Sequence, residues 1–215
     1  MTEACDSDPA RPPRTMSRDV RRQQVIEATI ETLAAHGYAR TTLTQVARTA
    51  GISHGLVLFH FDTKENLLSE TLAYLAEEYR RNWTEALAAA GPAPSDQLNA
   101  MIEADFNPRI CTPARLAAWC SFWGEAQSRP LYQASCGDKD DAYTSILEDT
   151  CARLSDEGGY GRDPVHTARL IRVAIEGVWL DLMTMATPYA REEALCTVQM
   201  AAALCFPDHF EMRKA

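Results

Sequence analysis

Residues 41–68 read TTLTQVARTAGISHGLVLFHFDTKENLL, and this stretch indicates how the first part of the chain folds. We expect Thr44 to cap one short helix that ends at Gly51, and Ser53 to cap a second one over residues 54–59. Two short helices joined by a Gly-containing turn form a helix-turn-helix, whose second helix fits a DNA major groove. The same pattern also fits two ordinary core helices, so the turn alone leaves the function open.

Longer helices are expected on both sides of this motif. Upstream, apolar residues between Val25 and Leu33 recur at three- and four-residue spacing and predict a helix over residues 17–36. Downstream, the same spacing predicts a helix over residues 64–90, capped by Asp62 or Thr63. The first part of the chain is therefore expected to be a three-helix bundle followed by a long helix.

The remaining sequence shows helical periodicity and no sustained strand alternation. Breaks at Gly and Pro residues separate further predicted helices over residues 95–107, 113–127, 130–155, 164–186 and 190–204. The sequence predicts an all-α protein of about nine helices. A disordered tail at residues 1–15 precedes a helix-turn-helix domain at 16–63, and a helical bundle follows at 64–215.

The charge is unevenly distributed along the 215 residues, whose formal net charge is −9. Residues 9–61 contain seven arginines and three acidic residues, whereas residues 62–215 contain 14 basic and 24 acidic residues. A basic segment at one end of an acidic chain indicates a module that binds nucleic acid or another charged ligand. The average charge, taken alone, argues against such a partner.

The seven cysteines are odd in number and form no CxxC pair, which favours reduced thiols over a disulfide or metal framework. A redox-sensing role is the alternative. The first 15 residues lack the apolar core of a secretory signal, and the longest apolar stretch, residues 195–206, is about half a membrane span. We therefore expect a cytoplasmic protein with no membrane partner.

Enzyme motifs are absent from the sequence. It contains no Gly-rich phosphate loop and no Gly-x-Ser-x-Gly elbow, and its five histidines lack metal-ligand spacing. We expect no catalytic residues, no metal site and no cofactor. The remaining classes are a DNA-binding regulator and a helical ligand-binding or scaffold protein that does not bind DNA. The basic first helix favours the regulator.

The N-terminal stretch resembles the DNA-binding domain of the TetR family of repressors. The blocks that carry the resemblance are RRQQVIEA at 21–28, HGY at 36–38, TTLTQVA at 41–47, AGISHG at 50–55 and FHFDTKENLL at 59–68. The resemblance implies a homodimer that binds a palindromic double-stranded DNA operator. It also implies one three-helix DNA-reading domain per subunit and a C-terminal bundle for ligand binding and dimerisation.

The resemblance assigns DNA contacts to Arg18, Arg21, Arg22, Thr42, Thr44, Ser53, His54, Gly55, Leu56, Leu58, His60 and Lys64. The three arginines are expected at flanking phosphates or in the minor groove. His54 and Leu56 are expected to reach base edges, while Thr44, His60 and Lys64 are expected to contact phosphate. Ser53 and Gly55 begin the recognition helix.

One position departs from the family pattern. Leu58 stands where many family members have a tyrosine that contacts phosphate, and leucine cannot donate that hydrogen bond. A thymine methyl group is the contact expected instead. The neighbouring Phe59 and Phe61 are expected to belong to the core.

Aromatic residues concentrate in the C-terminal part. Trp119, Phe122 and Trp123 have the spacing of one helix face, which fits either core packing or an aromatic cage for a quaternary ammonium ion. Residues 116–123, 129–132 and 170–180 are similar to the choline-responsive repressors of betaine operons. This similarity implies a small cationic effector such as choline, and a polyamine, an aromatic ligand or an amphipathic ligand is the alternative. The expected ligand-binding residues are Asp105, Phe106, Trp119, Phe122, Trp123, Tyr132, Glu176 and Trp179.

The last two predicted helices carry small and apolar residues that allow close helix approach. In the family this pair forms a four-helix dimer interface, and intramolecular packing is the alternative. The resemblance implies allosteric repression, in which ligand favours a spacing of the two DNA-reading domains that no longer fits the operator. The long helix from residue 64 is the expected lever between the two domains.

Overall fold

The computed structural model describes residues 17–125 and 129–210. These residues form nine helices and no strand: α1 (Arg18–His36), α2 (Leu43–Ala50), α3 (His54–Phe61), α4 (Lys64–Ala89), α5 (Pro94–Asp105), α6 (Pro113–Gly124), α7 (Arg129–Gly158), α8 (Pro164–Thr184) and α9 (Arg191–Cys205). The all-α prediction is confirmed, and the predicted C-terminal helices are present with ends shifted by at most three residues. The tail predicted at residues 1–15 lies outside the described residues.

Side-chain caps begin the helices of the N-terminal group. Ser17, Ser53 and Thr63 each accept a hydrogen bond from the backbone N–H three residues later, at 3.3, 3.2 and 3.1 Å. Each bond satisfies one of the N–H groups that the first turn of a helix leaves unpaired. Gly51 ends α2 with φ 66° and ψ 32°, a left-handed conformation that glycine adopts without steric cost.

The prediction that Thr44 caps α2 is wrong. The helix begins at Leu43, and the cap is Thr42, whose hydroxyl accepts from the backbone N–H of Gln45. The side chain of Gln45 in turn accepts from the Thr42 backbone N–H at 2.9 Å, which completes a capping box. This reciprocal pair satisfies two groups at once, so the helix starts earlier and Thr44 becomes an exposed residue of its first turn.

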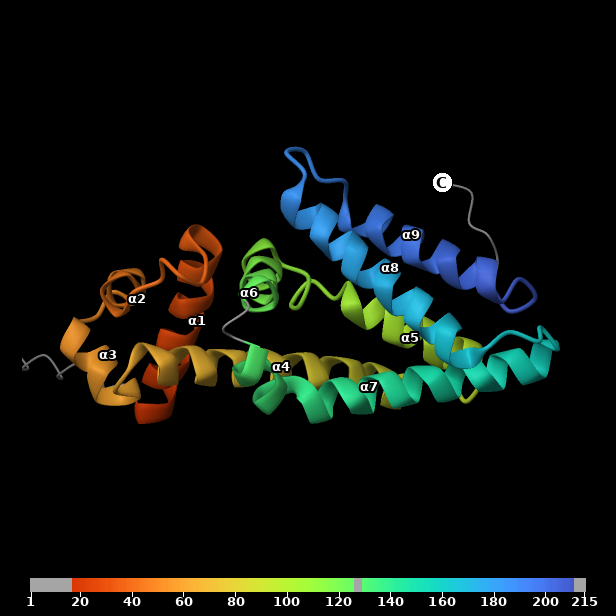
Figure 1. Ribbon diagram of the computed structural model, residues 1–215, viewed down its shortest axis with the longest axis horizontal. Helices are drawn as coiled ribbons and strands as arrows, with labels where there is room; N and C mark the ends of the chain where they lie inside the picture. Colours follow the sequence, from red (N-terminus) through yellow and green to blue (C-terminus); the bar gives the residue numbers. More distant parts are fainter. Residues whose placement is uncertain (1–16, 126–128, 211–215) are drawn as a thin grey trace, which may run out of the picture.

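The helices form two groups that share α4 (Figure 1). Helices α1–α3 form the smaller group, here called the head, and α4 runs from the head into the larger bundle of α5–α9. Helix α6 packs against both α1 and α8, so it also lies between the two groups. Helices α8 and α9 lie side by side at the far edge of the bundle. A conformational change in the bundle can therefore be transmitted to the head through α4 and α6.

The core of the head confirms one of the two phenylalanine predictions. Phe61 is 3% exposed and packs with Val57 of the same helix face, as predicted. Phe59 is 71% exposed, so its expected place in the core is wrong. Positions 57 and 61 lie one turn apart on the buried side of α3, which turns residue 59 toward solvent.

Every helix within residues 17–125 and 129–210 is too short or too polar to span a membrane.

Candidate functional site

A cavity opens in the larger bundle where α4, α6, α7 and α8 meet. The space open to the centre of a water-sized sphere is about 40 Å³. A single water needs about 10–15 Å³ by this measure, so the cavity has room for more than one water-sized group. Its lining is mostly aromatic and charged and consists of Tyr79, Trp119, Trp123, Tyr132, Asp140, Tyr143, Arg172, Ile175, Glu176 and Trp179.

Five rings of this lining form walls around the cavity, and we call Tyr79, Trp119, Trp123, Tyr132 and Trp179 the aromatic cage. The ring centroids of Trp119 and Trp123 are 6.1 Å apart, and those of Trp123 and Trp179 are 6.5 Å apart with planes only 12° from parallel. Tyr79 and Tyr132 meet Trp119 edge-on at 6.3 and 6.4 Å. Trp123 is 41% exposed, so it forms the solvent side of the cage.

A carboxyl group is buried behind the cage. Asp105, at the end of α5, is fully buried, and its side-chain oxygens accept hydrogen bonds from the hydroxyls of Tyr79 and Tyr143 at 2.6 and 2.9 Å. Its backbone oxygen accepts the indole N–H of Trp179 at 3.2 Å. Burial raises the pKa of Asp105 to about 7, and the two tyrosine hydrogen bonds oppose this shift. A charge arriving in the cavity can therefore change the protonation of this group.

The charged residues of the lining are the ion pair Arg172–Glu176 and the carboxyl group of Asp140, which forms no ion pair with the described residues. Arg172 donates from Nε to Glu176 at 3.0 Å and from Nη1 to the Thr144 hydroxyl at 2.8 Å. Asp140 accepts a hydrogen bond from the Tyr132 hydroxyl at 3.0 Å, and burial raises the pKa of this carboxyl. Within the described part of the chain, Asp140 and Asp105 are the acids near the cavity that form no ion pair.

The first turn of α3 presents a second candidate surface. Ser53, His54 and Gly55 are exposed there, and Leu58 is exposed one turn further along. The Thr44 hydroxyl lies 3.4 Å from Nδ1 of His54, so α2 and α3 meet at this surface. An added Cβ on Gly55 meets nothing within 4 Å, so the surface is open at this residue.

Two predicted phosphate-binding cations already have partners inside the protein. Arg22 donates to the carbonyl oxygen of His60 at 2.6 Å and forms an ion pair with Glu70. Lys64 donates from Nζ to the carbonyl oxygens of residues 38 and 39, both at 3.3 Å. A phosphate contact by either side chain requires it to exchange some of these bonds, so both contacts stay predictions.

His60 is buried rather than displayed. It is 9% exposed, and its Nδ1 has no hydrogen-bond partner among the described residues. Burial lowers the pKa of His60, and the nearby charges of Arg18, Arg22 and Arg21 lower it further. Burial and three nearby cations therefore both favour the neutral ring, and its contact with phosphate also stays a prediction.

The cysteines give little support to a redox alternative. Burial raises the pKa of Cys111 to about 11 and that of Cys136 and Cys151 to about 12. The pKa values of Cys120 and Cys205 are raised by burial as well. Because the thiolate is the reactive form, these five described thiols lack the character that redox sensing requires.

Two known protein families match different parts of this chain. The model described as "Bacterial regulatory proteins, tetR family" matches residues 25–71. The model described as "BetI-type transcriptional repressor, C-terminal" matches residues 94–206, just over half of the chain. The chain belongs to the TetR family. This result confirms the predicted family and identifies the protein as a transcriptional regulator rather than an enzyme.

Individual relatives agree with the TetR-family assignment over most of the chain. The HTH-type transcriptional regulator BetI of Paraburkholderia xenovorans is 27% identical over 197 residues, which cover 86% of this chain and 93% of the relative. A transcriptional regulator from Pseudomonas aeruginosa PAO1 has the same fold with a TM-score of 0.73 and 24% identity, covering 90% and 94% of the two chains. A regulator from Saccharomonospora viridis, solved in complex with choline, has a TM-score of 0.70 at 17% identity, covering 84% and 94%.

The structure brings most of the predicted effector residues of this TetR-family chain together. Those that line the cavity are Trp119, Trp123, Tyr132, Glu176 and Trp179, and Asp105 lies directly behind it. Phe122 does not line it: residues 119 and 123 lie one turn apart toward the cavity, whereas the Phe122 ring meets Tyr38 of the head edge-on at 5.7 Å. Phe106 is buried just after α5 and lines a different hollow, between α4, α5 and α9.

Sequence reasoning missed several lining residues of this family member. Tyr79 and Tyr143 read as apolar positions of long helices, and only the fold shows that their hydroxyls meet at Asp105. Asp140 lies in an acidic run that looks like a solvated face. Arg172 had a usable signal, because it stands four residues before Glu176 on a predicted helix, the spacing of an ion pair.

Proposed function

We propose that this TetR-family regulator represses transcription as a homodimer on a palindromic operator and is released by a small cationic effector of the quaternary ammonium class. The observation that carries the effector class is the aromatic cage of three indoles and two phenols with acids beside and behind it. The faces of these rings are negative and attract cations, most strongly in the case of tryptophan. A quaternary ammonium ion offers no N–H donor, so such a cage is its natural site.

The charge of the site supports a cation over an anion. The Arg172–Glu176 pair contributes no net charge, while Asp140 and Asp105 add negative charge when ionised. The solved structure of the Saccharomonospora viridis regulator with choline supports this class by fold analogy at 17% identity. Choline is therefore the first probe, and a polyamine, an aromatic acid and a fatty acid represent the alternative classes.

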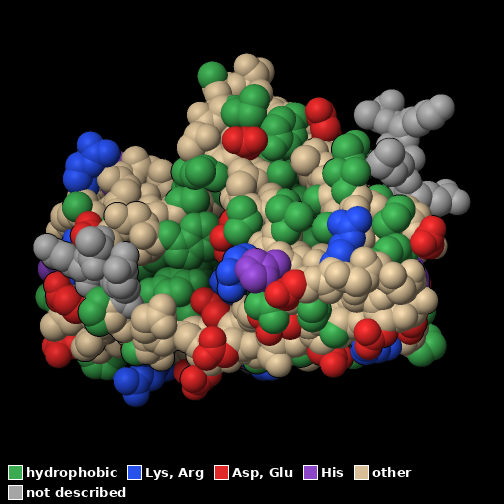
Figure 2. All heavy atoms as spheres, turned by 45° about the vertical axis from the view of Figure 1, so that its right-hand side comes forward, with side chains coloured by type: hydrophobic (Ala, Val, Ile, Leu, Met, Phe, Trp, Pro, Cys, Tyr) green, Lys and Arg blue, Asp and Glu red, His purple; other side chains and the backbone are tan. Residues whose placement is uncertain are grey.

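The exposed faces of α8 and α9 support the homodimer. Leu170, Val173 and Leu180 on α8 are 56%, 56% and 50% exposed, and Met200 and Leu204 on α9 are 43% and 61% exposed. Hydrophobic side chains gather over the upper part of the face seen in Figure 2, where these helices lie. Adjacent apolar side chains on two neighbouring helices mark an interaction surface. A second copy meeting the same surface across a two-fold axis forms a closed dimer.

The dimer places two copies of α3 for DNA recognition. In helix-turn-helix dimers the two recognition helices enter major grooves about 34–36 Å apart, which gives a palindromic operator. Effector in the bundle then favours a head spacing that fits this distance less well. Because the effector binds one arrangement of the heads more tightly than the other, it lowers the affinity of the protein for its operator. Bound operator lowers the affinity of the protein for the effector by the same factor.

The effector class is tested by titrating the purified protein with choline and, in parallel, with spermidine, benzoate and palmitate. Tryptophan fluorescence and the thermal unfolding midpoint are recorded for each compound. We expect choline to quench fluorescence and raise the midpoint, because the indoles line the cavity and a ligand that binds only the folded state stabilises it. A clear response to another compound, with none to choline, would remove the quaternary ammonium assignment.

A further inference from the structure

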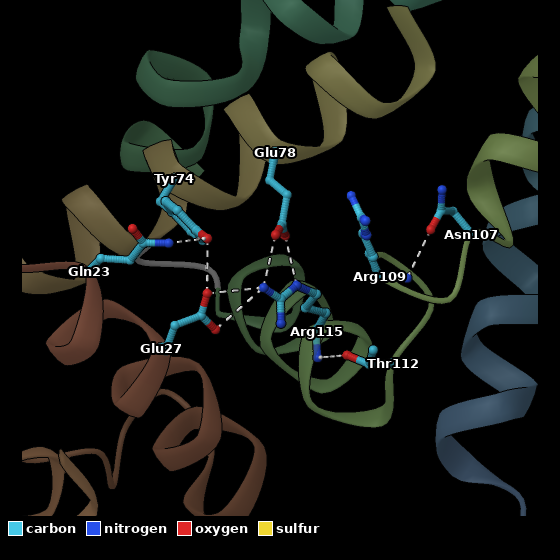
Figure 3. A network of polar contacts seen from close by, with 8 residues as sticks. All are labelled: Gln23, Glu27, Tyr74, Glu78, Asn107, Arg109, Thr112 and Arg115. Atoms are coloured by element: carbon cyan, nitrogen blue, oxygen red, sulfur yellow. Dashed lines mark hydrogen bonds and ion pairs between the residues drawn. The ribbon is translucent and has the colours of Figure 1, made fainter. Parts of the chain in front are cut away.

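Arg115, in the first turn of α6, connects three helices through its guanidinium group (Figure 3). Its Nε and Nη2 donate to the two carboxylate oxygens of Glu78 on α4, at 2.7 and 2.9 Å. Nη2 also donates to Glu27 on α1, at 3.1 and 3.3 Å to its two oxygens. One side chain of the bundle thus joins the shared helix α4 to the head.

The contacts of Arg115 with Glu78 and with Glu27, here called the junction, differ in strength. The Arg115–Glu78 contact is a two-pronged fork whose side chains are both only 15% exposed, the geometry in which an arginine–carboxylate pair is strongest. The Glu27 contact is longer, uses one nitrogen, and involves a carboxylate that is 40% exposed. Glu27 also accepts a hydrogen bond from the Tyr74 hydroxyl at 2.9 Å. When the helices shift, the bond between Arg115 and Glu27 is therefore the one expected to break.

The same helices carry the cavity. Trp119 of the aromatic cage stands four residues after Arg115, one turn further along α6. Tyr79 of the cage directly follows Glu78 on α4. The rings of Trp119 and Tyr79 meet at 6.3 Å, so the cage and the junction are two adjacent layers of contact between α4 and α6. A ligand that displaces either ring is therefore expected to displace the contacts of Arg115 as well.

We propose that Arg115 is a positioning residue that couples the cavity to the head: its bond to Glu27 holds α1 in the DNA-binding arrangement, and effector occupancy breaks that bond. This inference rests on the proposed function for the identity of the effector. Arg115 touches neither DNA nor effector and acts only through α1. The variant Glu27→Gln keeps the shape of the side chain and its acceptor for Tyr74 but removes the charge that Arg115 holds.

The matched control is Glu31→Gln. Glu31 lies one turn after Glu27 on the same helix and forms no ion pair among the described residues. Both variants remove one negative charge from the head, so both change the general attraction to DNA equally. Any difference between them reports the bond to Arg115. Arg115→Lys is a second test, since a single ammonium cannot make the fork and the Glu27 bond together.

The experiment measures operator affinity of the full-length protein by fluorescence anisotropy, with and without saturating choline, on a duplex selected by the protein from a random library. Without choline, we expect Glu27→Gln to bind at least about fivefold more weakly than Glu31→Gln. With choline, the control should respond as the wild type does, whereas the response of Glu27→Gln should largely disappear. Arg115→Lys should fall between them. By the same linkage, choline affinity without DNA should rise in Glu27→Gln, by up to the factor lost in operator affinity, and should stay within about twofold of the wild type in Glu31→Gln.

Two outcomes are decisive. If Glu27→Gln and Glu31→Gln bind operator equally and respond equally to choline, the positioning role of Arg115 is wrong. If the wild type does not respond to choline at all, the proposed effector fails, and the choline-free comparison of the two variants still decides the role of Arg115. Thermal unfolding of both variants verifies that they are folded, so that weaker operator binding cannot result from unfolded protein.

Discussion

The hydroxyl of Tyr79 donates a 2.6 Å hydrogen bond to the buried carboxyl of Asp105 while the ring of the same tyrosine lines the cavity. The acid is thereby placed behind the aromatic cage rather than in contact with solvent. Tyr143 of α7 donates to the same carboxyl, and Arg172 and Glu176 of α8 act on it with opposite charges. The protonation of Asp105 and the occupancy of the cavity are therefore linked.

This linkage predicts that choline binds more tightly as the pH rises from 6 to 8. Burial raises the pKa of Asp105 to about 7, so the empty protein carries a largely neutral group below that pH and an ionised one above it. A cation in the cavity stabilises the ionised form, so affinity increases through pH 7 and levels off above it. Calorimetry in buffers of different ionisation enthalpy should show proton release at pH 6.5. The variant Asp105→Asn should bind with less pH dependence, and an equally steep profile in this variant would assign the effect to another group.

The cage predicts a loss of choline affinity in Trp123→Ala. Cation–π contacts contribute about 0.5–2 kcal/mol, so affinity should fall about two- to thirtyfold. Trp123 is 41% exposed, which makes a folding defect a minor concern. Phe59→Ala is the control, because it removes an exposed aromatic ring from α3. Fluorescence or calorimetric titration should show unchanged affinity in the control, and an unchanged affinity in Trp123→Ala would contradict the cage.

The helix periods and the turn at Gly51 were sufficient to predict the nine helices of residues 17–125 and 129–210, because apolar spacing, caps and breaks are local properties. The start of α2 was misplaced because a capping box depends on a reciprocal side chain, Gln45. Two of the three indoles of the cavity, Trp119 and Trp123, were predictable as a cluster on one helix. Arg172 was predictable only as the ion-pair partner of Glu176, four residues later on the same helix. Asp140 was not predictable, because its place in the lining depends on how α7 packs against its neighbours, and apolar periodicity does not show which polar residue such packing buries.

Lys64 is the next test of the DNA surface. Lys64→Ala should weaken binding to all DNA sequences and reduce the slope of log affinity against log salt by about one, since one phosphate contact releases about one counterion. Arg81→Ala on the distant part of α4 should leave the slope unchanged. The structure shows Lys64 bonded to two carbonyl oxygens at 3.3 Å, and an unchanged slope would mean that these bonds persist on DNA.

The dimer surface predicts that Val173→Glu gives a monomer. A carboxylate at this half-exposed position of α8 faces the apolar side chains of the second copy and loses its hydration there. Sedimentation velocity should show a single species of about 24 kDa in place of a dimer. Val20→Glu, at a residue of α1 that is 50% exposed, should remain dimeric. A dimeric Val173→Glu would place the interface elsewhere.

In the proposed mechanism, a quaternary ammonium ion in the aromatic cage releases this regulator from its operator. This release is measured as dissociation of the full-length protein from a selected operator duplex, followed by fluorescence anisotropy during choline titration. We expect operator affinity to fall about 5- to 150-fold at saturation, the usual range of allosteric coupling, with half the effect at the choline concentration that half-quenches tryptophan fluorescence. Fluorescence quenching without any change in operator affinity would contradict this mechanism.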